Sequence, residues 1–188
     1  MVFNFKITSK EIISSYFKNK NIFDFAQASN FIQNLPYKRN HDKTNKLCVL
    51  NDCGGTCSTK HALLKELAIE NNFEELKLML GIFNMNFQNT PKISKILTKY
   101  NLIEIPEAHN YFKIGENYLD FTRENSKPED FLADLKKEIE IQTYQITDFK
   151  LAFHKDYLKK YLIENPQIIY NLENFWIIRE ESIAEFQA

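Results

Sequence analysis

The sequence predicts a single α+β domain, and three observations carry that prediction. The chain has 188 residues and is 44% hydrophobic, which is enough to fill one core. Apolar residues near both ends recur at the three-to-four spacing of amphipathic helices. Short aromatic and aliphatic runs between those ends have the length of strands. Because no repeat or linker divides the chain, residues 1–188 are expected to form one domain.

Two helices are expected over residues 9–35, with a break near residues 19–21. Their apolar positions recur every three to four residues, the spacing of one buried helix face. These positions are Ile12, Ile13, Tyr16 and Phe17, and then Phe25, Ala28, Phe31 and Ile32. Residues 36–55 are polar and rich in turn formers, so they are expected to form a loop.

The middle of the chain is expected to supply a helix and the strands. A helix is expected to begin at Cys57, followed by the buried strand LKLMLGIFNM and a short helix opened by Pro91. The runs AHNYFKI and NYLDFT, separated by the turn-like Gly115-Glu116-Asn117, predict a β-hairpin. Flanking helices are expected over residues 128–186, with one opened by Pro128, one over about 146–164 and one around 175–186.

Charge and hydropathy exclude several classes of partner. Twenty-four Lys and Arg balance 25 Asp and Glu, and this net charge of -1 argues against binding to nucleic acid or to an anionic membrane. No run of about 18 apolar residues and no secretory signal pattern is present, so a cytoplasmic protein is expected. The cysteines Cys48, Cys53 and Cys57 are odd in number and clustered, which predicts free thiols.

The segment DCGGTCSTKH, residues 52–61, is the strongest chemical signal in the chain. Two glycines permit a tight backbone turn just before Cys57, which then opens a helix. The free N–H groups and the positive dipole end of a helix N-terminus favour a thiolate over a thiol. The same N–H groups can hold the oxyanion that forms during acyl transfer. Cys57 is therefore the candidate nucleophile.

A cysteine nucleophile needs a general acid/base and a group that orients it. His109 lies on the first strand of the expected hairpin and Asp120 at the second. Facing positions on paired strands bring side chains within contact, so the two residues are candidates for these roles. His61 lies one turn beyond Cys57 on the same helix, where a packing or capping role is expected.

The segments GGTCSTKHALLKELA, EAHNYFKI and YLDFT resemble the transglutaminase-like superfamily of papain-type cysteine enzymes. The chain is also similar to a set of small bacterial proteins with a GTCS-x-KHALL segment, a likeness that names no substrate. The resemblance covers a core of about residues 36–122. It implies a papain/transglutaminase-like fold, in which a catalytic helix packs on a small antiparallel sheet. It also implies a Cys-His-Asp triad of Cys57, His109 and Asp120.

Departures from the superfamily pattern narrow the expected reaction. Ser58 follows the cysteine in place of tryptophan, and Asn110-Tyr111 follow the histidine in place of Ala-Trp, which argues against glutamine–lysine cross-linking. The expected activity is acyl transfer from an amide or peptide bond through a Cys57 thioester, with hydrolysis favoured over transfer to an amine. The substrate would be a peptide, a protein or a small amide, and no cofactor is required. Asn40 and Arg39 are candidates for the second oxyanion donor.

Two alternatives to the enzyme remain. The fold could serve as a non-catalytic peptide-binding or scaffolding domain, since fold does not dictate activity. Cys53, Cys57 and His61 are spaced by four, and His109 as a fourth ligand would complete a zinc site. Zinc knuckles usually space their cysteines by two residues, so no metal is the favoured expectation. The oligomeric state is open.

Overall fold

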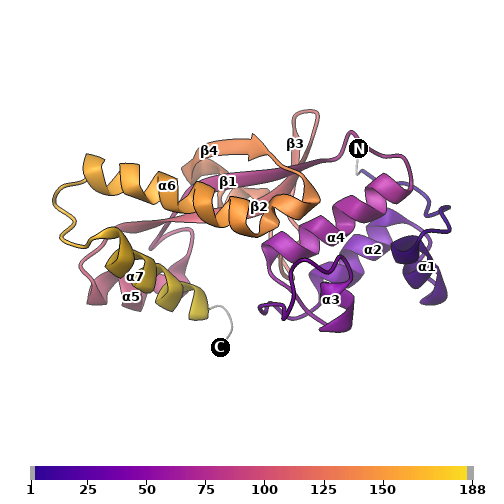
Figure 1. Cartoon of the computed structure of the whole chain (residues 1–188), viewed down its shortest axis with the longest axis horizontal. Coiled ribbons are helices and arrows are strands. Elements are labelled where there is room, and N and C mark those ends of the chain that lie inside the picture. The colour runs from indigo at the N-terminus through magenta and orange to yellow at the C-terminus, as the bar shows by residue number, and fades with distance from the viewer. Residues whose placement is uncertain (1–2, 186–188) are drawn as a thin grey trace. The chain divides into compact units, whose positions relative to one another are not determined.

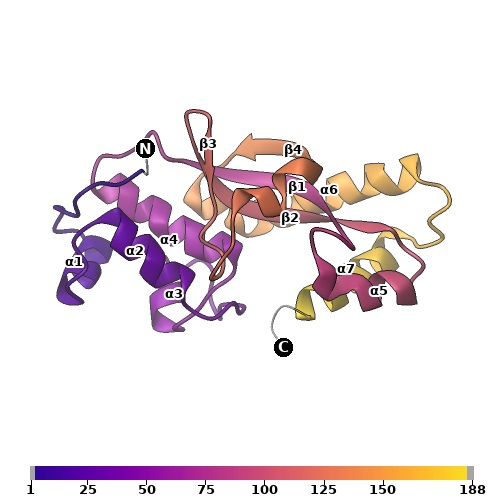
Figure 2. The same ribbon diagram turned by 180° about the vertical axis from the view of Figure 1, so that it is seen from behind.

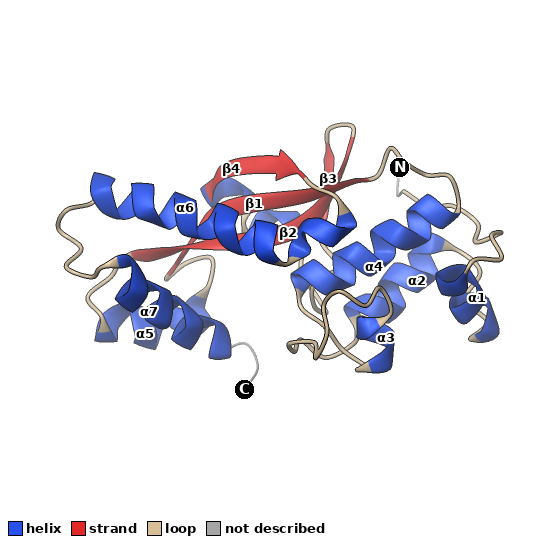
Figure 3. Cartoon of the chain, in the orientation of Figure 1, coloured by secondary structure: helices blue, strands red, loops and turns tan. Residues whose placement is uncertain are grey.

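The computed structural model describes residues 3–185 and is a mixed α+β fold (Figure 1). Over these residues, seven α-helices accompany one four-stranded antiparallel sheet in the order β3-β2-β1-β4 (Figure 3). The helices are α1 Ile12–Asn19, α2 Phe25–Gln33, α3 Cys48–Asn51, α4 Cys57–Glu70, α5 Ser94–Lys99, α6 Asp148–Glu164 and α7 Leu172–Ala184. The strands are β1 Lys77–Asn86, β2 Glu104–Ile114, β3 Asn117–Leu119 and β4 Leu135–Glu140. The α+β class is confirmed.

Internal contacts divide the chain into two compact units. The first unit comprises residues up to Met79 together with Asn110–Lys127 and Glu140–Thr147. The second unit comprises Leu80–His109, Pro128–Ile139 and the residues from Asp148 onward. That residues 1–188 act as one domain stays a prediction.

Helix α4 is the centre of the first unit. It contacts α1, α2 and α3 (Figure 2). It also contacts the 3₁₀ turn η4, Thr143–Ile146. Its side chains are buried on nearly every side, as expected for a core helix. Farther along the same unit, the ring of Phe5 stacks on Phe73 at 4.1 Å and on Phe25 at 5.0 Å.

Short polar contacts define where α1 and α2 begin. The Glu70 carboxylate accepts the backbone N–H groups of Ile13 at 3.0 Å and of Ser14 at 2.7 Å, which satisfies free donors of the first turn of α1. Asp24 caps α2 by accepting from the Gln27 N–H at 2.9 Å. The expected pair of helices within residues 9–35 is confirmed.

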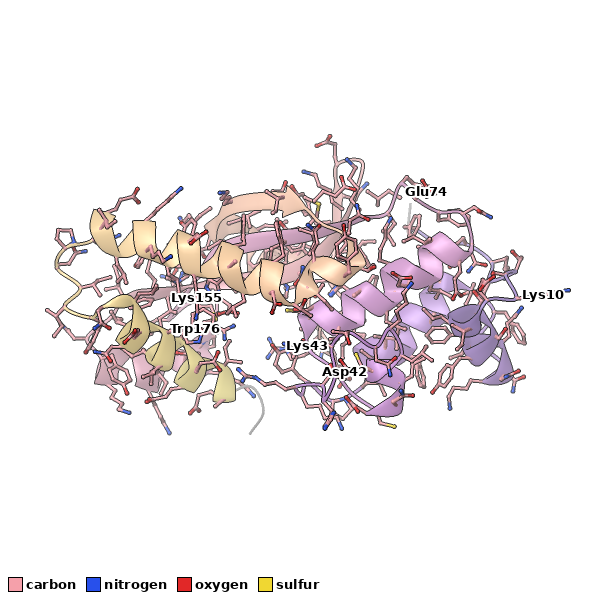
Figure 4. The ribbon with its side chains drawn as sticks, viewed as in Figure 1. Lys10, Asp42, Lys43, Glu74, Lys155 and Trp176 are labelled. Carbon is pink, nitrogen blue, oxygen red and sulfur yellow. The ribbon has the colours of Figure 1, made fainter. Side chains whose placement is uncertain are left out.

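The second unit has its own apolar core around α5, α6 and α7. Its buried members are Met85, Ile93, Ile96, Leu97, Leu102, Ile105, Leu158, Tyr161, Phe175, Ile178 and Ile183. Arg179 on α7 donates to the Glu107 carboxylate of β2 through two of its nitrogens. The Lys155 ammonium lies 5.0 Å from the Trp176 ring centroid (Figure 4). Charge and ring contacts thus add to the apolar packing of α7.

The expected β-hairpin is confirmed. β2 and β3 pair antiparallel with Phe112 opposite Leu119 and Ile114 opposite Asn117. Gly115 in the turn has φ +54, a backbone conformation that favours glycine. Apart from the adjacent residues, no atom of residues 3–185 lies within 4 Å of the position that a Cβ would take there.

The helix expected to open at Pro128 is wrong. Residues 128–134 form two short 3₁₀ turns, and Leu135–Glu140 form strand β4 beside β1. Lys136, Lys137 and Glu138 lie on this strand, which is at the edge of the sheet. Backbone pairing with β1 outweighs the helix propensity of Lys and Glu, and charged residues suit an edge strand because they discourage further pairing.

The other helices expected near the C-terminus are confirmed as α6 and α7, while Phe186 lies outside the described residues. Within residues 3–185, no helix has both the length and the apolar character needed to cross a lipid bilayer.

Candidate functional site

Cys57 is the first residue of α4, as the sequence predicts. The preceding residue, Thr56, is the N-cap, with extended backbone angles and its N–H donated to Thr59 Oγ1 at 3.0 Å. The thiol lies 3.9 Å from Ser58 Oγ, and Cys57 is 6% exposed. Cys57 therefore lies in the first turn of a core helix, at the positive end of the helix dipole.

The turn before Cys57 uses its glycines for close approach. The left-handed backbone angle belongs to Cys53, with φ 50, and not to either glycine. A Cβ on Gly54 would lie 2.9 Å from Pro36 O, and one on Gly55 would lie 2.7 Å from Thr59 Oγ1. The glycines let the chain lie against a parallel neighbour, since Gly55 donates its N–H to Pro36 O at 3.1 Å.

Gly55→Ala is expected to destabilise the first unit by about 1–3 kcal/mol, since the added methyl group overpacks the space beside Thr59 and Val49. Urea unfolding followed by circular dichroism measures this loss. Gly115→Ala is a control without any clash, where only the positive φ opposes the new side chain. A loss for Gly55→Ala no larger than for Gly115→Ala would contradict the close-approach explanation.

Asn40 ties this turn to the first turn of α4. Its Nδ2 donates to Asp52 Oδ2 at 2.9 Å and to Gly54 O at 2.8 Å, and its Oδ1 accepts from Thr59 Oγ1 at 2.6 Å. The side chain is buried, and both amide hydrogens are used within the protein. This bonding gives Asn40 a positioning role. Its oxyanion role, like that of the exposed Arg39, stays a prediction.

Lys60, one turn along α4 from Cys57, carries a fully buried ammonium group. Its Nζ donates to three backbone oxygens, Gln33 O at 3.3 Å, Leu35 O at 2.5 Å and Thr122 O at 2.8 Å. Burial, and next the charge of Arg123, lower the pKa of Lys60 to about 8. Lys60 thus fastens α4 to the end of α2 and to the segment after β3.

His61 has a tautomer fixed by its two contacts. Its Nδ1 lies 2.8 Å from Cys57 O, an acceptor, so Nδ1 carries the proton. Its Nε2 accepts the N–H of Phe121 at 3.0 Å. Both ring nitrogens are engaged in the fold, so His61 links the start of α4 to the backbone beside Asp120.

Asp120 follows β3 directly and is buried. Its Oδ1 accepts from Thr122 N at 2.9 Å and from Thr122 Oγ1 at 2.5 Å. The same oxygen lies 3.6 Å from His61 Nε2. Since Lys60 and His61 hold the backbone of residues 121–122, two consecutive α4 residues position Asp120 within the unit that carries Cys57.

His109 belongs to the second unit, where aromatic rings surround its imidazole. The Phe131 ring lies 4.9 Å from the His109 ring, and the Phe83 ring lies 5.9 Å away, both edge-on. Cys57 and Asp120 belong to the first unit. The triad that would join these residues stays a prediction.

The three cysteines are free thiols, as expected. Burial raises the pKa of Cys48, which makes that thiol less reactive. Among residues 3–185, no group of three or more His, Cys, Asp and Glu side chains is placed to hold a metal ion. The zinc site considered as an alternative is not assembled, because both nitrogens of His61 are engaged by backbone groups.

No protein-family model matches the chain, and neither the curated proteins nor the solved structures contain a significant match.

The sequence did not predict the role of Lys60. Lys60 could have been recognised because it lies on a helix with apolar residues on several faces. A lysine on such a helix is buried, so its ammonium group must donate to buried acceptors.

Proposed function

We propose that this protein is a thiol-dependent acyl-transfer enzyme that hydrolyses an amide or peptide-type bond. Cys57 is the nucleophile, His109 the general acid/base, and Asp120 the group that orients His109. The observation that carries the proposal is the position of Cys57 at the first residue of α4. The substrate class is a peptide, a protein or a small amide.

The electrostatic surroundings of Cys57 support a reactive thiolate. Helix N-termini stabilise a negative charge through free N–H groups and the helix dipole. The charge of Cys57 also raises the pKa of Lys60, although burial dominates the pKa of that lysine. Since a charge interaction is reciprocal, the Lys60 ammonium favours the thiolate of Cys57 by the same interaction.

The proposed reaction has two halves. The Cys57 thiolate attacks the carbonyl carbon, and the His109 imidazolium donates its proton to the leaving amine as the C–N bond breaks. A Cys57 thioester and the free amine result. Neutral His109 then takes a proton from water, whose oxygen attacks the thioester and releases the carboxylic acid together with the thiolate. Hydrogen bonding from the first turn of α4 stabilises the oxyanion in both halves.

The generic ester p-nitrophenyl acetate tests the acyl-transfer chemistry without knowledge of the substrate. We expect wild-type protein to release nitrophenolate in a burst of one equivalent per chain, and the peptide containing Cys57 to gain one acetyl group by mass spectrometry. Cys57→Ala should abolish the burst, while Cys53→Ala should leave it unchanged. Acetylation spread over several cysteines or lysines, with no dependence on Cys57, would contradict the proposal.

A second candidate function, a peptide-binding or scaffolding domain, is favoured by the burial of Cys57, which is 6% exposed. Buried structural thiols are inert. The two functions differ in the acetylation result, because a scaffold would give no burst and no selective modification of Cys57. A Cys57→Ala variant of a scaffold would also retain all its binding properties.

A further inference from the structure

A pocket of about 130 Å³ opens within the first unit, beside the face of α4 that carries Ala62 and Leu63. Three segments of the chain line it. They are the loop and helix residues Lys43, Thr44, Asn45, Lys46 and Cys48, the α4 residues Thr59, Ala62, Leu63 and Glu66, and the residues of η4 and just after it, Thr143, Tyr144, Ile146 and Thr147. Its apolar wall comes from Cys48, Ala62, Leu63 and Ile146, which are all buried.

The four threonine hydroxyl groups that line this pocket are all hydrogen-bond donors to other groups of the protein. Each of the four threonine hydroxyls donates to a partner within the first unit. The donations run from Thr44 to Asp42, from Thr59 to Asn40, from Thr143 to Glu66 and from Thr147 to the Tyr144 carbonyl. A hydroxyl that donates still has acceptor capacity. The threonine rim can therefore accept hydrogen bonds from an occupant.

Much of the charge at the pocket is compensated. Lys46 Nζ lies 2.7 Å from Glu66 Oε2, and Glu66 Oε1 accepts from Thr143. Lys43, which also lines the pocket, and the adjacent Asp42 lie on the loop before α3 (Figure 4). Because Lys46 and Glu66 neutralise each other, this pair offers no free charge to a charged ligand. Such a ligand would lose its hydration against the apolar wall, and a neutral ligand avoids that cost.

We propose that this pocket binds a small neutral aromatic group with a single ring and one hydrogen-bond donor, as in phenol. An apolar cavity of about 150 Å³ is sufficient to bind benzene, so a volume of about 130 Å³ suits a single six-membered ring. The ring packs against Cys48, Ala62, Leu63 and Ile146, and its donor meets the lone pairs of the threonine rim. This site is independent of the proposed chemistry at Cys57.

Phenol and toluene are matched probes, because they have the same number of heavy atoms and only phenol donates a hydrogen bond. Ligand-observed NMR titration of the full chain should show saturable phenol binding that is at least tenfold tighter than toluene binding. Ala62→Leu fills the pocket and should weaken phenol binding at least tenfold. Ala26→Leu on α2, the same substitution outside the pocket, should leave the affinity unchanged.

A second measurement uses only the wild-type protein, so it tests the site even if Ala62→Leu misfolds. Cys48 lines the pocket, whereas Cys53 is exposed and does not. Saturating phenol should slow the alkylation of Cys48 by N-ethylmaleimide at least fivefold, and should leave the rate at Cys53 unchanged. Failure of phenol to saturate, or unchanged alkylation of Cys48, would overturn the site. Equal affinities for toluene and phenol would overturn the donor requirement.

Discussion

Lys60→Met is expected to lower the free energy of unfolding by about 2–4 kcal/mol. Methionine fills a similar volume but leaves the carbonyl groups of Gln33, Leu35 and Thr122 without their shared donor. Leaving these buried carbonyl groups unpaired destabilises the fold, whereas removing the buried ammonium charge stabilises it. The first effect is expected to be larger, because the hydrogen bonds of the ammonium already offset much of the cost of burying its charge. Urea unfolding of wild-type and variant protein measures the difference.

Lys65→Met is the matched control on the same helix. Lys65 Nζ donates to the single carbonyl of Glu74 at 2.9 Å, so its loss is expected to cost about 1 kcal/mol. Equal decreases in the free energy of unfolding for the two variants would contradict the prediction that the three carbonyl contacts of Lys60 stabilise the fold more than the single contact of Lys65.

The effect of Lys60→Met should also grow with pH. The pKa of Lys60 is about 8 in the folded protein, against an ordinary value of 10.5. Between these two values the unfolded chain holds more protons at this site than the folded chain, so the wild-type stability contributed by Lys60 rises with pH. The difference between wild type and Lys60→Met should therefore be larger at pH 10 than at pH 7.

Arg179→Met is expected to destabilise the second unit by about 3–5 kcal/mol. The Arg179 and Glu107 side chains are only 12% and 10% exposed, and removing the guanidinium leaves a buried carboxylate without its partner. Burial is the largest single influence and would raise the pKa of Glu107, but the charges of Arg179 and His154 and the Arg179 hydrogen bonds together outweigh it and lower that pKa. Thermal unfolding at neutral pH measures the loss.

Two comparisons separate the buried pair from a general charge effect. Lys99→Met breaks the exposed ion pair with Glu181 and should cost at most about 1 kcal/mol. In the double variant Glu107→Gln/Arg179→Met, part of the loss should return because no charge remains buried. The lowered pKa of Glu107 means that the pair stabilises the fold above the ordinary carboxyl pKa of 4.5. That stability is lost as the pH falls through the lowered pKa. A double variant as unstable as Arg179→Met would contradict this explanation.

Local signals were sufficient for much of the fold. The turn at Gly115 and the helical periodicity of α1, α2 and α4 each depend on residues close in sequence. Strand β4 was missed because Lys136 and Lys137 favour a helix locally, while pairing with β1 depends on residues more than fifty positions away. Tertiary context decided that segment.

The candidate site was predictable only where it is local. The placement of Cys57 at the start of α4 follows from Gly54, Gly55 and Thr56, which precede it directly. The roles of Lys60 and Asn40 depend on contacts with Thr122 and Thr59, which lie 62 and 19 residues away. No spacing rule reveals which carbonyl group a buried lysine will reach.

The pH dependence of iodoacetamide labelling at Cys48, Cys53 and Cys57 tests the proposed nucleophile most directly. Peptide mass spectrometry would give the rate at each thiol in wild type, in His109→Ala and in the control His41→Ala, which changes an exposed loop histidine. The proposal predicts selective labelling of Cys57 with an apparent pKa well below the free-thiol value of about 8.5, raised by His109→Ala and unchanged by His41→Ala. Labelling of Cys57 no faster than that of Cys53, with no response to His109→Ala, would contradict it.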